Sequence, residues 1–139
     1  MNNVYHLGIN LGHDRSAAIV VDGEIKVAIQ QERLDRSKHS LGYLNQFMGD
    51  NTKIQLPWES IHYCLNELGI GFEQLGSITA NMPGTDYSAD ILKKALPQNT
   101  IDKIQVIPSH HLSHAYTAYW PSGFDKSLIL SIDATGSTY

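Results

Sequence analysis

The stretch VYHLGINLGHDRSAAIVVDGEIKVAIQQER, from Val4 to Arg33, decides the fold of this chain. Its first run, Val4–Gly12, is apolar and rich in residues that favour strands, and two further runs meet at Asp22-Gly23. An Asp-Gly pair between two alternating apolar runs is the strongest short-range signal for a hairpin. The sequence therefore predicts three consecutive antiparallel strands at the start of the chain.

The rest of the chain alternates between helical and strand patterns. Residues 58–69 (WESIHYCLNELG) carry apolar side chains at helical spacing and end at a glycine. We predict strands in 76–84, 103–109 and 126–139, helices in 87–96 and 109–120, and in 34–57 a loop with at most one helical turn. This order predicts a mixed α/β sheet with helices on both faces.

The same element order matches one ribonuclease H-like lobe of the actin-like ATPase and sugar-kinase superfamily, in which two lobes normally clasp a nucleotide. Residues 1–125 are therefore predicted to form the first lobe. Residues 126–139, KSLILSIDATGSTY, are predicted to be the first strand and turn of a second lobe that is truncated in this chain.

Composition narrows the class of protein. The 139 residues suit one domain of common size, and 42% hydrophobic content is enough for a core. Ten Lys and Arg against 14 Asp and Glu give a formal charge of -4, which argues against nucleic acid as the main partner. The single cysteine, the lack of a long apolar run and the absence of a signal-peptide pattern predict a cytoplasmic protein without a membrane partner.

Three histidines lie within five positions in SHHLSHAYTAYW, Ser109–Trp120. On a helix of ~3.6 residues per turn, His110 and His114 would project from the same face, which suits two ligands of one metal ion. His111 lies about a quarter-turn away and is expected to be structural. Surface or core histidines without a metal are the alternative interpretation of this spacing.

Two further segments carry polar groups that could bind anions or transfer protons. In the turn GHDRSA, Gly12 permits close backbone approach and Ser16 can donate to an anion, while His13 has the intrinsic pKa of a general base. Asp14 would orient His13 or cap the turn. In QERLDRSKH the cations suit phosphate oxygens, although such a run is usually a solvated loop.

Four segments together carry a family resemblance: LGINLGHDRSAAIVVDGEI, QERLDRSKH, HHLSHAYTAYWPSGF and LILSIDATG. They resemble the N-terminal part of the O-carbamoyltransferases of the nodulation-protein U and cephamycin carbamoyltransferase group, which includes the tobramycin carbamoyltransferase. The resemblance implies an enzyme that forms carbamoyl-adenylate from carbamoyl phosphate and ATP. It would then transfer the carbamoyl group to a hydroxyl of a small-molecule natural product.

The resemblance also implies roles for individual residues. It implies a divalent metal, typically iron, with zinc or magnesium as alternatives, held by His110, His114 and Asp133. It implies that His13 acts as the base for the acceptor hydroxyl and that Lys38 contacts the carbamoyl group. Binding of phosphates and the carbamoyl end would involve Gly12, Asp14, Ser16, Arg33, Arg36, Thr135 and Gly136.

Two other interpretations remain open. The chain could be a non-catalytic metal- or nucleotide-binding half-subunit that needs the remainder of the enzyme, a partner chain or a second copy of itself. It could also be a sugar-kinase or actin-like ATPase relative, because DATGS resembles the phosphate-binding turns of those proteins. The histidine motif favours the carbamoyltransferase.

Overall fold

The computed structural model describes residues 4–40, 56–81, 88–107 and 109–132. Its first three strands, β1 (Tyr5–Asn10), β2 (Ser16–Val21) and β3 (Glu24–Gln30), are antiparallel neighbours. Asp22 and Gly23 between β2 and β3 have φ values of 51° and 82°. Two successive positive φ values are what a tight two-residue hairpin turn requires, so the predicted hairpin is confirmed.

The sheet is completed by two strands parallel to β1. β4 (Leu75–Asn81) pairs with β1, and the short β5 (Ile104–Gln105) pairs with β4, which gives the order β3-β2-β1-β4-β5. Three antiparallel strands followed by parallel ones separated by helices confirm the predicted ribonuclease H-like lobe. In this register Asn10 lies opposite Ser16 on one side and Asn81 on the other, so the ends of β1 and β4 meet.

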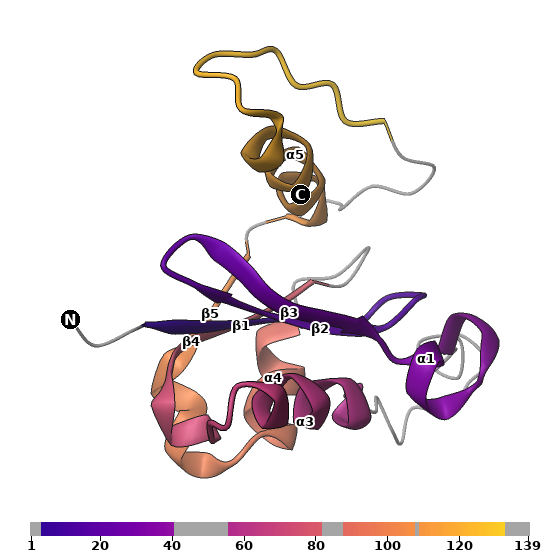
Figure 1. Cartoon of the computed structure of the whole chain (residues 1–139), viewed down its shortest axis with the longest axis vertical. Coiled ribbons are helices and arrows are strands. Elements are labelled where there is room, and N and C mark those ends of the chain that lie inside the picture. Colours follow the sequence, from indigo (N-terminus) through magenta and orange to yellow (C-terminus); the bar gives the residue numbers. More distant parts are fainter. Residues whose placement is uncertain (1–3, 41–55, 82–87, 108, 133–139) are drawn as a thin grey trace.

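Helices lie on both sides of the sheet, as predicted (Figure 1). α3 (Trp58–Glu67) and α4 (Ser88–Ala95) cover one face, and α5 (His110–Tyr119) lies on the opposite side. Gly69, with φ of 62°, follows α3 in the left-handed conformation that ends many helices. The indole nitrogen of Trp120, just after α5, donates to the carbonyl oxygen of Gly23 at 3.4 Å, which joins this end of the helix to the β2–β3 turn.

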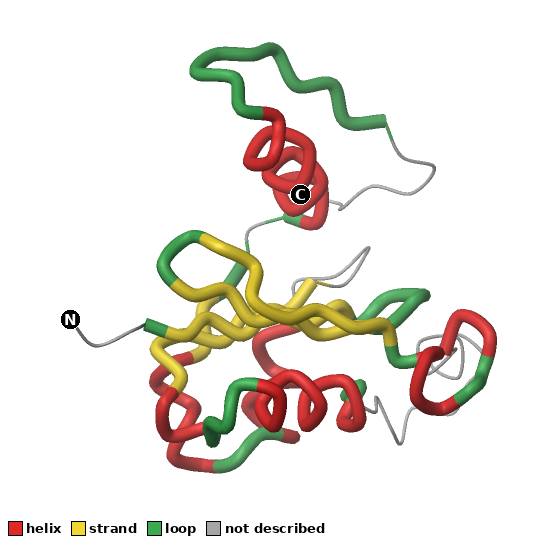
Figure 2. The backbone as a smooth tube through the Cα atoms, in the orientation of Figure 1, coloured by secondary structure: helices red, strands yellow, loops and turns green. Residues whose placement is uncertain are grey.

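Shorter helical segments make up much of the remaining connections, shown in red in Figure 2. α1 (Glu32–Asp35) is one helical turn that begins just before the predicted loop 34–57 and extends into it. Single 3-10 turns or short runs of them are formed by Lys38–Ser40, Phe72–Gln74, Gln98–Lys103 and Trp120–Ser122.

The core lies between the sheet and the α3–α4 layer. Alternate residues of the strands point into it, because side chains in a strand alternate between the two faces. Its fully buried members include Leu7 of β1, Ile19 of β2, Ile78 of β4, Ile61 of α3 and Leu92 of α4. Gly8, Ala18 and Thr79, at the intervening positions, line a cavity of ≈590 Å³ on the other face.

One predicted element is not formed in the described part of the chain. Lys126–Ile132 was expected to be a strand, but the structure has a loop there, with Leu128, Leu130 and Ile132 mostly exposed. A strand is stabilised by hydrogen bonds to a neighbouring strand, and none of the strands in the described ranges pairs with this run. The apolar run indicated a strand, but the sequence pattern does not say which strand would pair with it. The boundary between lobes at residue 125 stays a prediction.

Within the described ranges, none of the helices is long and apolar enough to cross a membrane.

Candidate functional site

The turn between β1 and β2 is fixed by the side chain of Asn10. The side-chain oxygen of Asn10, Oδ1, accepts a hydrogen bond from the backbone N–H of Gly12 at 3.1 Å. Its amide nitrogen donates to the carbonyl oxygens of His13 at 3.0 Å and Asp14 at 3.2 Å. Asn and Asp often close turns in this way, because their short polar side chains reach the backbone a few residues further on. Asn10 therefore holds the backbone of His13 and Asp14 in place.

The carboxylate of Asp14 lies between two imidazoles. Nδ1 of His39 is 2.8 Å from Oδ1 of Asp14, and Nδ1 of His13 is 2.6 Å from Oδ2. These two hydrogen bonds, the one from His39 first, hold the pKa of Asp14 below its ordinary value of 3.8, although slight burial opposes them. Asp14 is therefore ionised at neutral pH and accepts from both rings.

The segment 31–40 is pinned against the β1–β2 turn by the buried side chain of Arg15. Its Nε donates to the carbonyl oxygen of Ser40 and its Nη2 to the Ser40 hydroxyl, both at 2.8 Å. The Ser40 hydroxyl in turn donates to Asp35 at 2.7 Å. Asp35 is exposed as a residue, but partial desolvation of its carboxylate would raise its pKa. Hydrogen bonds from Ser37 and Ser40 and the charge of Arg15 outweigh this and lower the pKa.

A second region of polar side chains belongs to α5. Ser109 begins this helix, because its hydroxyl accepts from the N–H of Leu112 at 3.3 Å. His110 is buried and His114 is exposed, with ring centroids 5.5 Å apart. The His111 ring lies 4.2 Å from that of His110. The predicted helix is thus confirmed, and it brings the predicted histidine pair within reach of each other.

A cavity of ≈540 Å³ lies between the β1–β2 turn and α5. It is lined by Gly12 and His13 from the turn, by His110 and His114 from α5, and by Asn10 and Asn81 from the ends of β1 and β4. Residues Leu130, Ser131 and Ile132 complete its wall. The structure therefore brings the predicted proton-transfer residue and the predicted metal pair to one cavity.

The other predicted site residues are distributed differently. Ser16 and Arg33 line the ≈590 Å³ cavity on the sheet face, with Asn10 and Asn81 common to both cavities. Arg36 and Lys38 are exposed and line neither cavity. Asp133, Thr135 and Gly136 lie outside the described residues, so the predicted third metal ligand and the predicted phosphate turn stay predictions.

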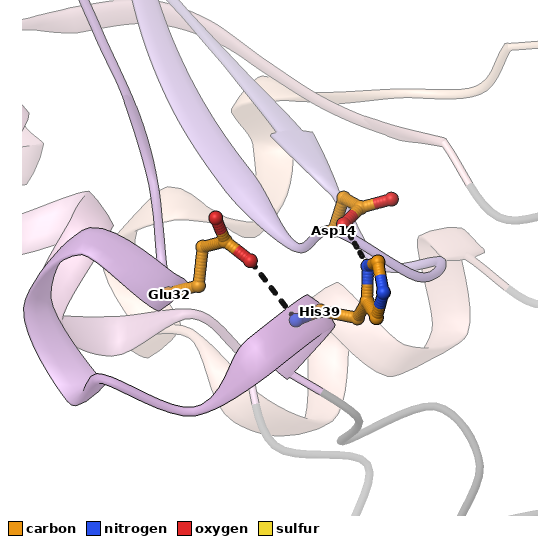
Figure 3. Close-up of side chains that lie close together, drawn as sticks. All are labelled: Asp14, Glu32 and His39. Atoms are coloured by element: carbon orange, nitrogen blue, oxygen red, sulfur yellow. Dashed lines mark hydrogen bonds and ion pairs between the residues drawn. The ribbon is translucent and has the colours of Figure 1, made fainter.

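One group of side chains was not predicted as a site. Asp14, Glu32 and His39 each offer a ligand atom, and these atoms lie within 4.8 Å of one another, close enough to hold a metal ion (Figure 3). The backbone N–H of His39 donates to Oε2 of Glu32 at 3.0 Å. The sequence pattern carries no signal for this group, because Asp14 is 18 and 25 positions from its two partners and only the packing of segment 31–40 joins them.

Comparisons with known proteins place the chain among proteins of related sequence. No family model matches it. It is 30% identical to an uncharacterized protein of Synechocystis sp. over 89% of this chain and 24% of that protein. It is also 30% identical to nodulation protein NolNO of Sinorhizobium fredii over 89% of this chain and 20% of that protein. The predicted likeness to nodulation proteins is thus confirmed.

A third relative is an uncharacterized protein of Methanocaldococcus jannaschii, 29% identical over 94% of this chain and 22% of that protein. The chain therefore spans about a quarter or less of the length of these curated relatives. The crystal structure of an uncharacterized protein with similarity to peptidase YEAZ from Pseudomonas aeruginosa matches with a TM-score of 0.49 and 14% identity. That match covers 84% of this chain and 49% of the other.

Proposed function

We propose that this chain is the N-terminal portion of an ATP-dependent O-carbamoyltransferase. Its substrates would be carbamoyl phosphate, ATP and a hydroxyl of a small-molecule natural product. The observation that carries the proposal is the cavity shared by His13 of the β1–β2 turn and the pair His110 and His114 of α5. The similarity to a nodulation protein and the resemblance of four motifs to the carbamoyltransferase group support the same reaction.

The proposed reaction has three steps, and in each of them one bond is broken and another is formed. Carbamoyl phosphate loses its phosphate to water and leaves carbamate. An oxygen of carbamate attacks the α-phosphorus of ATP, which forms carbamoyl-adenylate and releases pyrophosphate. The acceptor hydroxyl then attacks the carbamoyl carbon, gives its proton to a base, and AMP leaves. The enzyme must therefore hold several phosphates and supply one base.

His13 is suited to be that base. Because Asp14 is ionised and 2.6 Å from Nδ1, Nδ1 of a neutral His13 carries the hydrogen and Nε2 carries the lone pair. A carboxylate that fixes the tautomer of a histidine in this way also stabilises the imidazolium that forms on proton transfer. His13 would take the proton of the acceptor hydroxyl at Nε2, and Asp14 would hold the ring in position.

The histidine pair of α5 suits a divalent transition metal. Two imidazoles one helical turn apart are common ligands of iron and zinc, and a carboxylate such as that of Asp133 would complete a set with open positions. A metal bound there would neutralise phosphate oxygens. Gly12 lines this cavity and, without a side chain, would let phosphates approach the backbone. Ser16 would donate its hydroxyl to phosphate oxygens in the neighbouring cavity on the sheet face.

The cations of segment 31–40 would act on the carbamoyl and phosphate groups. Arg33 lines the cavity on the sheet face beside Ser16 and would hold phosphate oxygens there. Arg36 and Lys38 are exposed, and neither takes part in an ion pair with another described residue. Their long side chains could therefore contact a bound substrate. We assign Lys38 to the carbamoyl oxygen, and Thr135 and Gly136 to the nucleotide phosphates.

The test uses the protein expressed from its complete reading frame. It is incubated with ATP, radiolabelled carbamoyl phosphate and a panel of hydroxyl compounds, and pyrophosphate release and carbamoylated product are measured separately. We expect pyrophosphate release that depends on carbamoyl phosphate. His13→Ala should lose product formation but keep pyrophosphate release, and His114→Ala should lose both. His62→Ala, an exposed histidine on α3, is the matched control and should keep both. Full activity in His13→Ala and His114→Ala would remove the proposed roles.

A second candidate is a half-site that binds metal or nucleotide only together with a partner chain. It is favoured by Leu130 and Ile132, which line the cavity and are 80% and 83% exposed. Exposed apolar residues of this kind usually meet another surface. This candidate predicts that the complete reading frame releases no pyrophosphate by itself.

A further inference from the structure

We propose that Asp14, Glu32 and His39 bind a divalent transition-metal cation, at a site other than the histidine pair of α5. These side chains come from the β1–β2 turn, from α1 and from the Lys38–Ser40 turn, and they lie close together (Figure 3). The site stands on these residues alone and does not depend on the carbamoyl-transfer reaction.

The distances suit ligands of one ion. Two ligand atoms that are each about 2.1 Å from a metal lie about 3 Å apart when adjacent and about 4.2 Å apart when opposite. Nδ1 of His39 and Oδ1 of Asp14 are 2.8 Å apart, the spacing of adjacent ligands. All three ligand atoms lie within 4.8 Å of one another. The three side chains are exposed or half-buried, so rotations about their side-chain bonds would bring these atoms to the spacing of ligands of one ion.

The backbone around the site is assembled by bonds that do not involve the three ligand atoms. The N–H of Asp14 donates to the carbonyl oxygen of His39 at 2.9 Å, and the N–H of Gln31 donates to that of Arg15 at 2.7 Å. The guanidinium of Arg15 adds two hydrogen bonds to Ser40. Because these contacts already join the two segments, an ion would not have to bring them together from a distance.

The charge of the group also favours a cation. Two carboxylates and one neutral imidazole carry a formal charge near −2. Nη2 of Arg33 is 3.6 Å from Oε1 of Glu32, and this guanidinium is exposed. Oδ2 of Asp14 is paired with His13 and Oδ1 with Nδ1 of His39, so an ion at Oδ1 would take the place of the hydrogen bond between Asp14 and His39. The ion would replace the hydrogen on Nδ1 of His39, and that ring would then bind as the neutral base.

The donor set selects the class of ion. One imidazole and two carboxylates suit zinc, manganese or ferrous iron, and they suit soft monovalent ions poorly because sulfur ligands are missing from the group. Three protein ligands leave positions for water. An ion here would fasten Glu32 of α1 and the turn after it to the β1–β2 turn. It would thereby hold the segment that contains Arg33, Arg36 and Lys38 close to His13.

The experiment measures the amount of Zn²⁺ bound per chain, using the protein from its complete reading frame after dialysis against Zn²⁺ and then against metal-free buffer. His39→Ala and Glu32→Gln remove one ligand each at exposed or half-buried positions. The matched controls are His62→Ala and Glu67→Gln, exposed residues of α3 outside the site. His114→Ala tests the pair on α5 independently. Circular dichroism checks that every variant is folded.

We expect His39→Ala and Glu32→Gln each to bind one zinc ion fewer than the wild-type protein and the two controls. Their melting temperatures should also rise less when Zn²⁺ is added. Retention of this ion in His114→Ala supports the proposed site. Wild-type stoichiometry in His39→Ala and Glu32→Gln, or loss of all zinc in His114→Ala, would overturn it.

The outcomes also separate this inference from the proposed function. Loss of zinc in the His39 and Glu32 variants with no change in His114→Ala supports the new site and removes the metal role of the α5 pair. Loss of zinc only in His114→Ala supports the metal role of the α5 pair and removes the new site.

Discussion

Replacing Ser40 by alanine is expected to lower the free energy of unfolding by about 2 kcal/mol. Ser40 is 1% exposed, and its hydroxyl both accepts from the Arg15 guanidinium at 2.8 Å and donates to Asp35 at 2.7 Å. The substitution removes one oxygen atom and leaves the backbone contact from Arg15 to the Ser40 carbonyl in place. It therefore isolates the contribution of the hydroxyl.

The magnitude follows from the two partners. A hydrogen bond to a charged group contributes about 1.5 kcal/mol or more, and Arg15 is buried, so its lost bond is not replaced by bulk water. Asp35 is exposed, and solvent would replace most of its lost bond, so that contact adds about 0.5 kcal/mol. The sum is about 2 kcal/mol.

Ser40→Gly is the matched variant. Ser40 has φ of 43°, in the left-handed region, where a residue with a Cβ atom is strained by about 1 kcal/mol and glycine is not. The glycine variant loses the same hydroxyl but relieves this strain, and the greater freedom of glycine in the unfolded chain offsets part of the gain. We expect it to be about 0.5 kcal/mol more stable than the alanine variant.

The assay is urea unfolding followed by far-UV circular dichroism. With a slope of about 2 kcal/mol per molar urea, Ser40→Ala should lower the midpoint by about 1 M with an unchanged slope. A loss smaller than about 0.5 kcal/mol, the range of ordinary surface substitutions, would refute the buried bond between Arg15 and Ser40. A glycine variant less stable than the alanine variant would refute the backbone strain.

Three further predictions concern other parts of the chain. Cys64 should react far more slowly with a thiol reagent in the folded protein than in urea, because burial raises the pKa of its thiol to about 11; equal rates would contradict this. Gly69→Ala should lower the free energy of unfolding by about 1 kcal/mol in urea titrations, since φ is 62° and no neighbouring atom would clash; an unchanged midpoint would contradict the left-handed helix end. The lowered pKa of Asp35 means that its carboxylate stabilises the fold above its unfolded pKa and that this contribution is lost as the pH falls through the lower folded pKa. The melting temperature of Asp35→Asn should therefore fall less than that of the wild type between about pH 5 and pH 3, and parallel curves would argue against it.

The elements that the sequence predicted correctly are those whose signals are local. Asp22-Gly23 defines a turn by its own backbone preferences, and Gly69 ends α3. Each signal acts within a few residues, so the pattern contains all the information needed. The histidine pair of α5 was predictable for the same reason, because its spacing needs only the helix.

The parts that failed depend on contacts between distant residues. The run Lys126–Ile132 has the apolar composition of a strand, but a strand forms only beside another, and the composition does not say whether a partner is present. The group of Asp14, Glu32 and His39 depends on how segment 31–40 packs onto the β1–β2 turn. That packing is directed by the buried Arg15, which in the sequence looks like any other charge before a strand.

The distribution of backbone strain connects these observations. Within the described ranges, the non-glycine residues with positive φ are Asp14, Asp22, Arg36, His39 and Ser40. Asp22 belongs to the hairpin turn, where positive φ is expected, and the other four lie in the two segments that Arg15 joins. Each such residue is destabilised by about 1 kcal/mol, so this arrangement survives only because other contacts over-determine it. The bonds of Arg15 to Ser40 are the buried contacts that do so. We therefore expect segment 31–40 to open locally at a lower free energy than the sheet, with Ser40→Ala lowering that free energy further. Hydrogen exchange measures both, and equal protection of this segment and β1 would contradict the reasoning.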